Sequence, residues 1–339
     1  MRPGTRSGIS WRWPYALRGL VTVTPAAAAT LSDVQLGAVL AVGLMPVCSL
    51  PLPARRVERA RLGLYGVLSA ASIFLGGVLA QWPVAAVVGL VLAGGGLGHA
   101  VVRLRRPVAM LGLMLCLPLF AVGFSYPGTE TVGEFAGDIL LGTAWAVLVA
   151  LLWPTPGATS APREEDVPTA GPGIPPAGVM IPYGWTAGLV GGACAAIGFA
   201  ADLEHVGWAP AAALLVMRPS PPAQQLRSVD RLADVALGAA VAVGLVVIDP
   251  PTWVFAVAIA LVGIGATATA GSSWYVLPTF TTFLVFILLL VGTTGDARER
   301  FWERVLETAL GIGVAAVATA LLLAVRGHHE RRDEASVPR

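Results

Sequence analysis

The chain has 339 residues, of which 56% are hydrophobic and 12% charged, with a formal net charge of +2 and a mean hydropathy of +0.75. Soluble domains carry about 25% charged residues, so this composition excludes a protein with an ordinary water-facing surface. All 22 basic residues are Arg. The absence of Lys excludes a P-loop ATPase, which needs a Lys on the phosphates, and a Schiff-base enzyme.

The apolar residues form blocks close to the ~20 residues that a helix needs to cross about 30 Å of hydrocarbon. The sequence therefore predicts an all-α, polytopic integral membrane protein of about twelve transmembrane helices. The predicted spans are 15–32, 35–50, 62–80, 82–102, 107–125, 134–153, 183–201, 206–217, 232–248, 252–270, 274–292 and 302–325.

A Pro- and Gly-rich segment separates the sixth and seventh predicted spans, and its composition is typical of a flexible linker. We expect four parts in the chain. They are a first six-helix repeat over 1–153, a cytoplasmic linker over 154–181, a second six-helix repeat over 182–325 and a disordered cytoplasmic tail over 326–339.

The two halves resemble each other at a nearly constant offset. Arg55 to Arg59 (RRVER) matches Arg227 to Arg231 (RSVDR), and Tyr15 and Met45 match Tyr183 and Met217. Six spans in each half would insert both halves the same way up, which predicts a pseudo-two-fold axis along the membrane normal.

Four glycines recur near the starts of every third predicted span. They follow an Arg-containing or acidic segment, and we expect them to let helices approach closely. They are Gly66, Gly142, Gly238 and Gly311.

The distribution of Arg predicts the orientation. With both termini in the cytoplasm, 19 of the 22 arginines lie on the cytoplasmic side, and only Arg298, Arg300 and Arg304 lie outside. This is a strong positive-inside pattern and predicts a multi-pass membrane protein with both termini in the cytoplasm. A cleaved secretory signal within residues 1–30 stays open as an alternative, although the match of Tyr15 to Tyr183 favours a retained first span.

The second half carries the motifs that indicate a family. A short span with Trp208 precedes RSVDRLADVALG (227–238) and later RVLETALGIG (304–313). In these residues the chain resembles the fusaric acid resistance (FUSC-type) and aromatic acid exporter family, although Asp234 and Val235 stand where that family commonly has Gly and Thr. The resemblance implies export of small organic, often aromatic, acids. It also implies the bacterial inner membrane as the location. We expect the lipid bilayer and a small organic anion as partners, and we expect no nucleic acid, no cofactor and no enzymatic activity. Homo-oligomer formation stays open.

The eighth predicted span, 206–217, suggests a substrate site. It is too short to cross the membrane alone and is followed by Arg218-Pro219-Ser220, and short, Pro-interrupted segments often mark a transporter's central site. We expect Arg218, with Ser220 beside it, to bind the substrate carboxylate, and Arg227 and Arg231 to form a basic entrance. Interfacial anchoring is the alternative role for all three arginines.

Proton coupling would require a titratable group. His205, beside Asp202 and Glu204, is the first candidate, and His99 is the second. All lie at span ends, so a solvated role without coupling stays open. His328-His329 is too sparse for a metal site, and no metal is expected.

Three functions stay open from the sequence. The first is a carrier that exports small organic anions. The second is a passive anion channel on the same scaffold, and the third is a membrane scaffold or accessory protein without transport. Motifs of a membrane enzyme, such as a nucleophile elbow or HExxH, are absent from the sequence.

Overall fold

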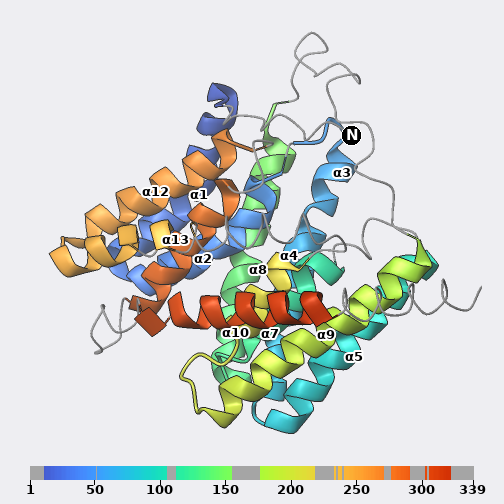
Figure 1. Ribbon diagram of the computed structural model, residues 1–339. Coiled ribbons are helices and arrows are strands. Elements are labelled where there is room, and N and C mark those ends of the chain that lie inside the picture. Colours follow the sequence, from blue (N-terminus) through green and yellow to red (C-terminus); the bar gives the residue numbers. More distant parts are fainter. Residues whose placement is uncertain are drawn as a thin grey trace, which may run out of the picture. The chain divides into compact units, whose positions relative to one another are not determined.

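The structure is a computed structural model. It describes residues 11–50, 52–104, 112–154, 176–217, 233, 236–238, 240–270, 276–290, 302–303 and 305–321. Within these ranges the secondary structure is entirely helical (Figure 1).

Each predicted span contains a helix or helical residues among those described, which confirms the all-α prediction. Long apolar blocks become helices because lipid offers no partner for a free backbone N–H or C=O, and a helix satisfies these groups internally. In the described part of the chain, four helices are long and apolar enough to cross a membrane. They are Arg56–Ala80, Pro83–Leu104, Thr129–Leu152 and Ala177–Ala200.

The helices fall into two compact units, and each unit draws on both halves of the chain. Unit 1 comprises Met1–Phe74, Thr129–Gly173 and Asp230–Val305, and unit 2 comprises Leu75–Gly128, Ile174–Val229 and Leu306–Arg339. Helix α4 (Gly63–Ala80) passes from unit 1 into unit 2.

Unit 1 contains the helical stretch 236–248, which is described except at residue 239, and six labelled helices. These are α1 (Trp13–Ser32), α2 (Val34–Cys48), α3 (Arg56–Arg61), α8 (Thr129–Leu152), α12 (Thr252–Ala268) and α13 (Val276–Leu290).

Unit 2 contains most of the helix Val305–Leu321 and five labelled elements. These are α5 (Pro83–Leu104), the π-helical turn η1 (Gly112–Cys116), α7 (Leu117–Gly123), α9 (Ala177–Ala200) and α10 (Trp208–Val216).

In unit 1, a single residue separates α1 from α2. The carboxylate of Asp33 accepts hydrogen bonds from the backbone N–H groups of Gln35 (2.8 Å) and Leu36 (3.1 Å). This is an N-cap, which satisfies donors that the first turn of α2 leaves unpaired. The cap starts a new helix and lets α2 pack against α1, while α1 also packs along α12 and α2 along α8.

In unit 2, α5 and α9 lie side by side (Figure 1) through facing small residues. Gly94 and Gly98 of α5 meet Gly184 and Gly188 of α9, and a Cβ added to Gly94 would stand 2.6 Å from the Gly188 Cα. This G-x-x-x-G arrangement lets the two backbones approach closely, so that packing contacts replace contacts with lipid tails.

The four recurring glycines are confirmed as close-approach positions. A Cβ at Gly66 would collide with Thr143, and one at Gly142 with the Leu40 carbonyl oxygen. Likewise, a Cβ at Gly311 would collide with the Ala209 carbonyl oxygen, and one at Gly238 would stand 3.0 Å from Thr282 Cγ2.

Two boundaries differ from the predicted ones. Helix α9 begins at Ala177, inside the segment predicted as linker, because Pro176 provides an extended N-cap and the apolar run already starts there. The fifth predicted span, 107–125, holds only η1 and α7 among the described residues, and Pro118 stands where η1 gives way to α7. Helix α10 has nine residues, as short as its sequence predicted.

Candidate functional site

The residues predicted to bind substrate lie outside the described ranges. These are Arg218, Ser220, Arg227 and Arg231. The last described residue before Arg218 is Met217, whose extended backbone (φ −58°, ψ 136°) ends α10. The Tyr183 hydroxyl donates to the Met217 carbonyl oxygen over 3.0 Å. The role of Arg218 stays a prediction.

The first candidates for proton coupling occupy the turn between α9 and α10. Asp202 and Glu204 are exposed and His205 is half-buried. Asp202 adopts the left-handed conformation (φ 51°), and the His205 carbonyl accepts from the Trp208 N–H. These residues therefore form the tip of a helical hairpin, which agrees with a position at a span end.

His99 lies near the end of α5 in unit 2. Its Nδ1 stands 2.8 Å from the Gly95 carbonyl oxygen, and its ring meets Trp185 edge-on at 6.3 Å. To make this hydrogen bond Nδ1 must carry the proton. The Gly95 contact and the Trp185 ring hold the side chain between α5 and α9.

The structure reveals a buried cation on α1, Arg18, which is one of the 19 arginines expected on the cytoplasmic side. Arg18 is 3% exposed, and its guanidinium lies 5.3 Å from the centre of the Tyr15 ring. Its Nη2 donates to the carbonyl oxygens of Cys48 (3.2 Å) and Leu50 (3.3 Å). Arg18 thus binds the C-terminal end of α2, where helix carbonyls lack partners.

A second buried cation, Arg59, binds the C-terminal end of α8. Its Nη1 donates to the carbonyl oxygens of Ala150 (2.9 Å) and Trp153 (2.7 Å), and its Nε donates to that of Pro53 (2.7 Å). Arg59 is 1% exposed, whereas its α3 neighbour Val57 is 66% exposed. Helix α3 therefore turns an arginine inward and a valine outward, which reverses the order that hydropathy predicts.

Both guanidiniums retain an unused donor. Among the described residues, Nη1 of Arg18 and Nη2 of Arg59 are buried without a hydrogen-bond partner. No described carboxylate forms an ion pair with either arginine. A signal for Arg18 existed in the sequence, since it is the one charged residue between Trp13 and Ser32.

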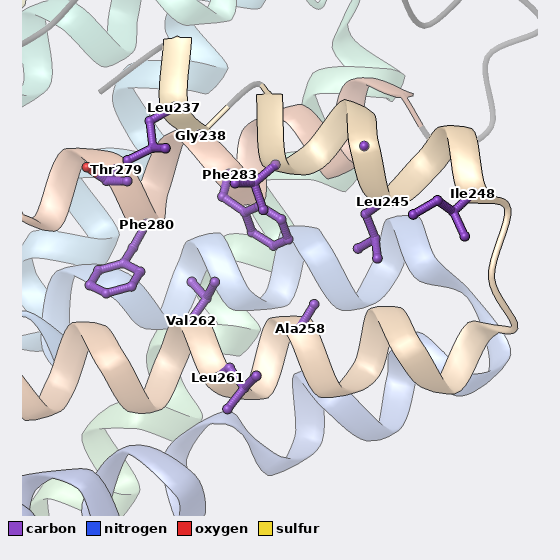
Figure 2. Close-up of a pocket in the computed structure, with 12 residues that line it drawn as sticks. Leu237, Gly238, Leu245, Ile248, Ala258, Leu261, Val262, Thr279, Phe280 and Phe283 are labelled. Atoms are coloured by element: carbon purple, nitrogen blue, oxygen red, sulfur yellow. The ribbon is translucent and has the colours of Figure 1, made fainter. Parts of the chain in front are cut away.

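Unit 1 also contains an apolar cavity of about 570 Å³. Figure 2 shows it between the stretch 236–248, α12 and α13. Its lining consists of aliphatic and aromatic residues and two glycines, apart from Thr279, with Phe280 and Phe283 from α13 and Leu261 from α12. Such a cavity suits a lipid chain or an apolar ring, but its described lining offers no cation for a carboxylate.

The fold and these features define a polytopic helical membrane protein. Residues 193–318 match the model of the family described as fusaric acid resistance protein-like. This match confirms the resemblance to FUSC-type proteins over that range, from α9 to the helix Val305–Leu321, and the family is one of membrane transport and resistance. Neither the curated proteins nor the solved structures include a match to this chain.

Proposed function

We propose that the protein is a transporter that exports small organic carboxylic acids, including aromatic ones, across the bacterial inner membrane. The observation that carries this proposal is the family match over residues 193–318. The membrane class of the helices and the two buried cations of unit 1 are compatible with an anionic substrate.

We also propose that the chain is built from two six-helix repeats that exchange a pair of helices. In predicted span numbers, α1 and α12 pair the first with the tenth span, and α5 and α9 pair the fourth with the seventh. Under the repeat, the first span corresponds to the seventh and the tenth to the fourth. The pair formed by α1 and α12 in one unit therefore corresponds to the pair formed by α9 and α5 in the other. The same relation links the pair α2 and α13 to the pair α10 and α7. These recurring pairs support a repeat, and they explain why each unit mixes residues from both halves.

The proposed topology of twelve spans places both termini and the 154–181 linker in the cytoplasm. The support is the Arg asymmetry, 19 of 22 on one side. We expect a reporter fused at residue 170 and one fused at the C-terminus to have cytoplasmic activity. Alkaline phosphatase activity at either position would contradict the twelve-span arrangement.

The function is tested by transport of a panel of labelled acids. We expect cells and proteoliposomes with the protein to release labelled benzoate faster than those without it. A carrier predicts saturable counterflow, in which unlabelled acid on one side accelerates uptake of label from the other. Release of the acid without counterflow would favour a passive anion channel. Release rates equal to those of protein-free vesicles for every acid would favour a membrane scaffold without transport.

We further propose that the membrane potential drives export. Moving one charge across 100 mV is worth about 2.3 kcal/mol, which supports roughly a fifty-fold outward gradient of a monoanion. Ionophores can impose potential and pH gradients separately on proteoliposomes. Efflux should follow the potential and persist in His205→Ala. Efflux that follows only the pH gradient and is lost in this variant would instead indicate proton coupling.

A further inference from the structure

Unit 1 holds two buried positive charges without a described counter-ion. Arg18 and Arg59 are 3% and 1% exposed, and each has one buried N–H group that no described residue accepts. Burying an unpaired charge is costly, and ionisable side chains inside a membrane domain are usually retained for function.

The two guanidiniums bind the same short connection of unit 1. Arg18 donates to the carbonyl of Leu50 and Arg59 to the carbonyl of Pro53, so both hold the short connection that follows α2. Three residues of chain span at most about 11 Å, which limits the distance between the two accepting carbonyls.

Hydrogen bonding to the C-terminal end of α2 does not by itself require the positive charge of Arg18. In unit 2, Tyr183 lies on the helix that corresponds to α1, and its neutral hydroxyl donates to Met217 at the end of α10. Met217 corresponds to Met45 near the end of α2. Unit 2 thus holds the end of its short helix with a hydroxyl, where unit 1 uses a guanidinium.

The local charge balance favours a monoanion. The C-terminal end of a helix carries roughly −0.5 charge, so the ends of α2 and α8 together offset about one of the two positive charges. About one positive charge remains. A carboxylate would neutralise it, and carboxylate oxygens accept charge-assisted hydrogen bonds from guanidinium N–H groups such as the two that are unused here.

We propose that Arg18 and Arg59 together bind the carboxylate of a small monoanionic acid at the end of unit 1 where α2 and α8 terminate. This site rests on the proposed function for the identity of the anion as a transported acid. Under the proposed topology it faces the cytoplasm, where an exported acid enters.

The test measures binding and transport separately. Equilibrium binding of benzoate, acetate, benzamide and chloride to the purified protein in detergent is followed by calorimetry. The variants are Arg18→Gln and Arg59→Gln, and the matched control is Arg61→Gln, which removes an exposed arginine from the same helix as Arg59. Size-exclusion profiles and helicity show whether each variant folds.

We expect a carboxylate to bind the wild type and the control equally, and its affinity to fall at least about tenfold in both arginine variants. The neutral benzamide should not bind. If Arg59→Gln fails to fold because the end of α8 loses its donor, Arg18→Gln decides the outcome. Unchanged carboxylate affinity in the folded variants, no carboxylate binding to the wild type, or a preference for chloride would overturn the site.

Efflux from proteoliposomes separates this site from the proposed function. If the wild type exports the acid and Arg18→Gln exports it at the same rate, the site is overturned but the exporter function is not. Carboxylate binding that depends on Arg18 and Arg59, without efflux by the wild type, would support the site and contradict the exporter.

Discussion

Replacement of Gly94 by Ala is expected to destabilise unit 2 by about 1–3 kcal/mol, the usual cost of overpacking a close contact. The added methyl group would stand 2.6 Å from the Gly188 Cα and 2.7 Å from the Gly184 carbonyl oxygen. Because these atoms belong to the α9 backbone, no rotamer change relieves the collision, and α5 and α9 must separate. Thermal unfolding in detergent should occur at a lower temperature than in the wild type.

Gly96 provides a matched control on the same helix. It is exposed, and a Cβ added there meets nothing within 4 Å. Gly→Ala at a free helical position usually stabilises by about 0.4–1 kcal/mol through the unfolded chain. The two variants should therefore move the unfolding temperature in opposite directions. Equal shifts would show that α5 and α9 do not approach as closely as described.

Replacement of Arg218 by Lys is expected to reduce benzoate efflux at least about tenfold at normal protein abundance, which corresponds to ~1.4 kcal/mol. Lys keeps the positive charge but loses the planar fork that donates two hydrogen bonds to one carboxylate. Arg218 directly follows Met217, whose carbonyl Tyr183 holds, and it has no counterpart in the first half. Initial rates in proteoliposomes of equal protein content measure the effect.

The control for Arg218→Lys is Arg103→Lys. Arg103 lies in the last turn of α5 and is exposed, so the exchange preserves its charge where no bidentate contact is described. Its efflux rate should equal that of the wild type. If Arg218→Lys also transports at the wild-type rate, Arg218 is an interfacial anchor and not a carboxylate ligand.

The helices and their approximate ends were predictable from sequence because the governing signal is local. In lipid, an apolar block of about 20 residues must form a helix to satisfy its backbone. Helices α1, α2, α4 and α12 accordingly begin within two residues of the predicted starts. The close approach at Gly142 and Gly311 was likewise predictable, since small residues recur where membrane helices meet.

The candidate site was predictable only in part. Arg218, Ser220, Arg227 and Arg231 lie outside the described residues, so they remain predictions. From the sequence, Arg55 and Arg59 belong to the same cytoplasmic segment, RRVER, but Arg55 is exposed in the structure and Arg59 is buried. In the structure, the carbonyl of Ala150, which is 91 residues away, accepts from Arg59. Arg55 is the N-cap residue of the six-residue helix α3 and Arg59 lies within it, and no local pattern of the sequence distinguishes the two arginines.

The sequence by itself determined that this is a helical membrane protein whose second half resembles FUSC-type proteins, because composition, block length and short motifs are properties of the chain alone. Only the tertiary structure decided that α1 packs on α12 and α5 on α9, so that each unit combines residues from both halves. It also decided that Arg18 and Arg59 are buried. The physical reason is that the burial of a side chain depends on which helices, distant in sequence, pack over it. Apolar helices have similar compositions, so the sequence of one helix does not indicate which other helix it packs against.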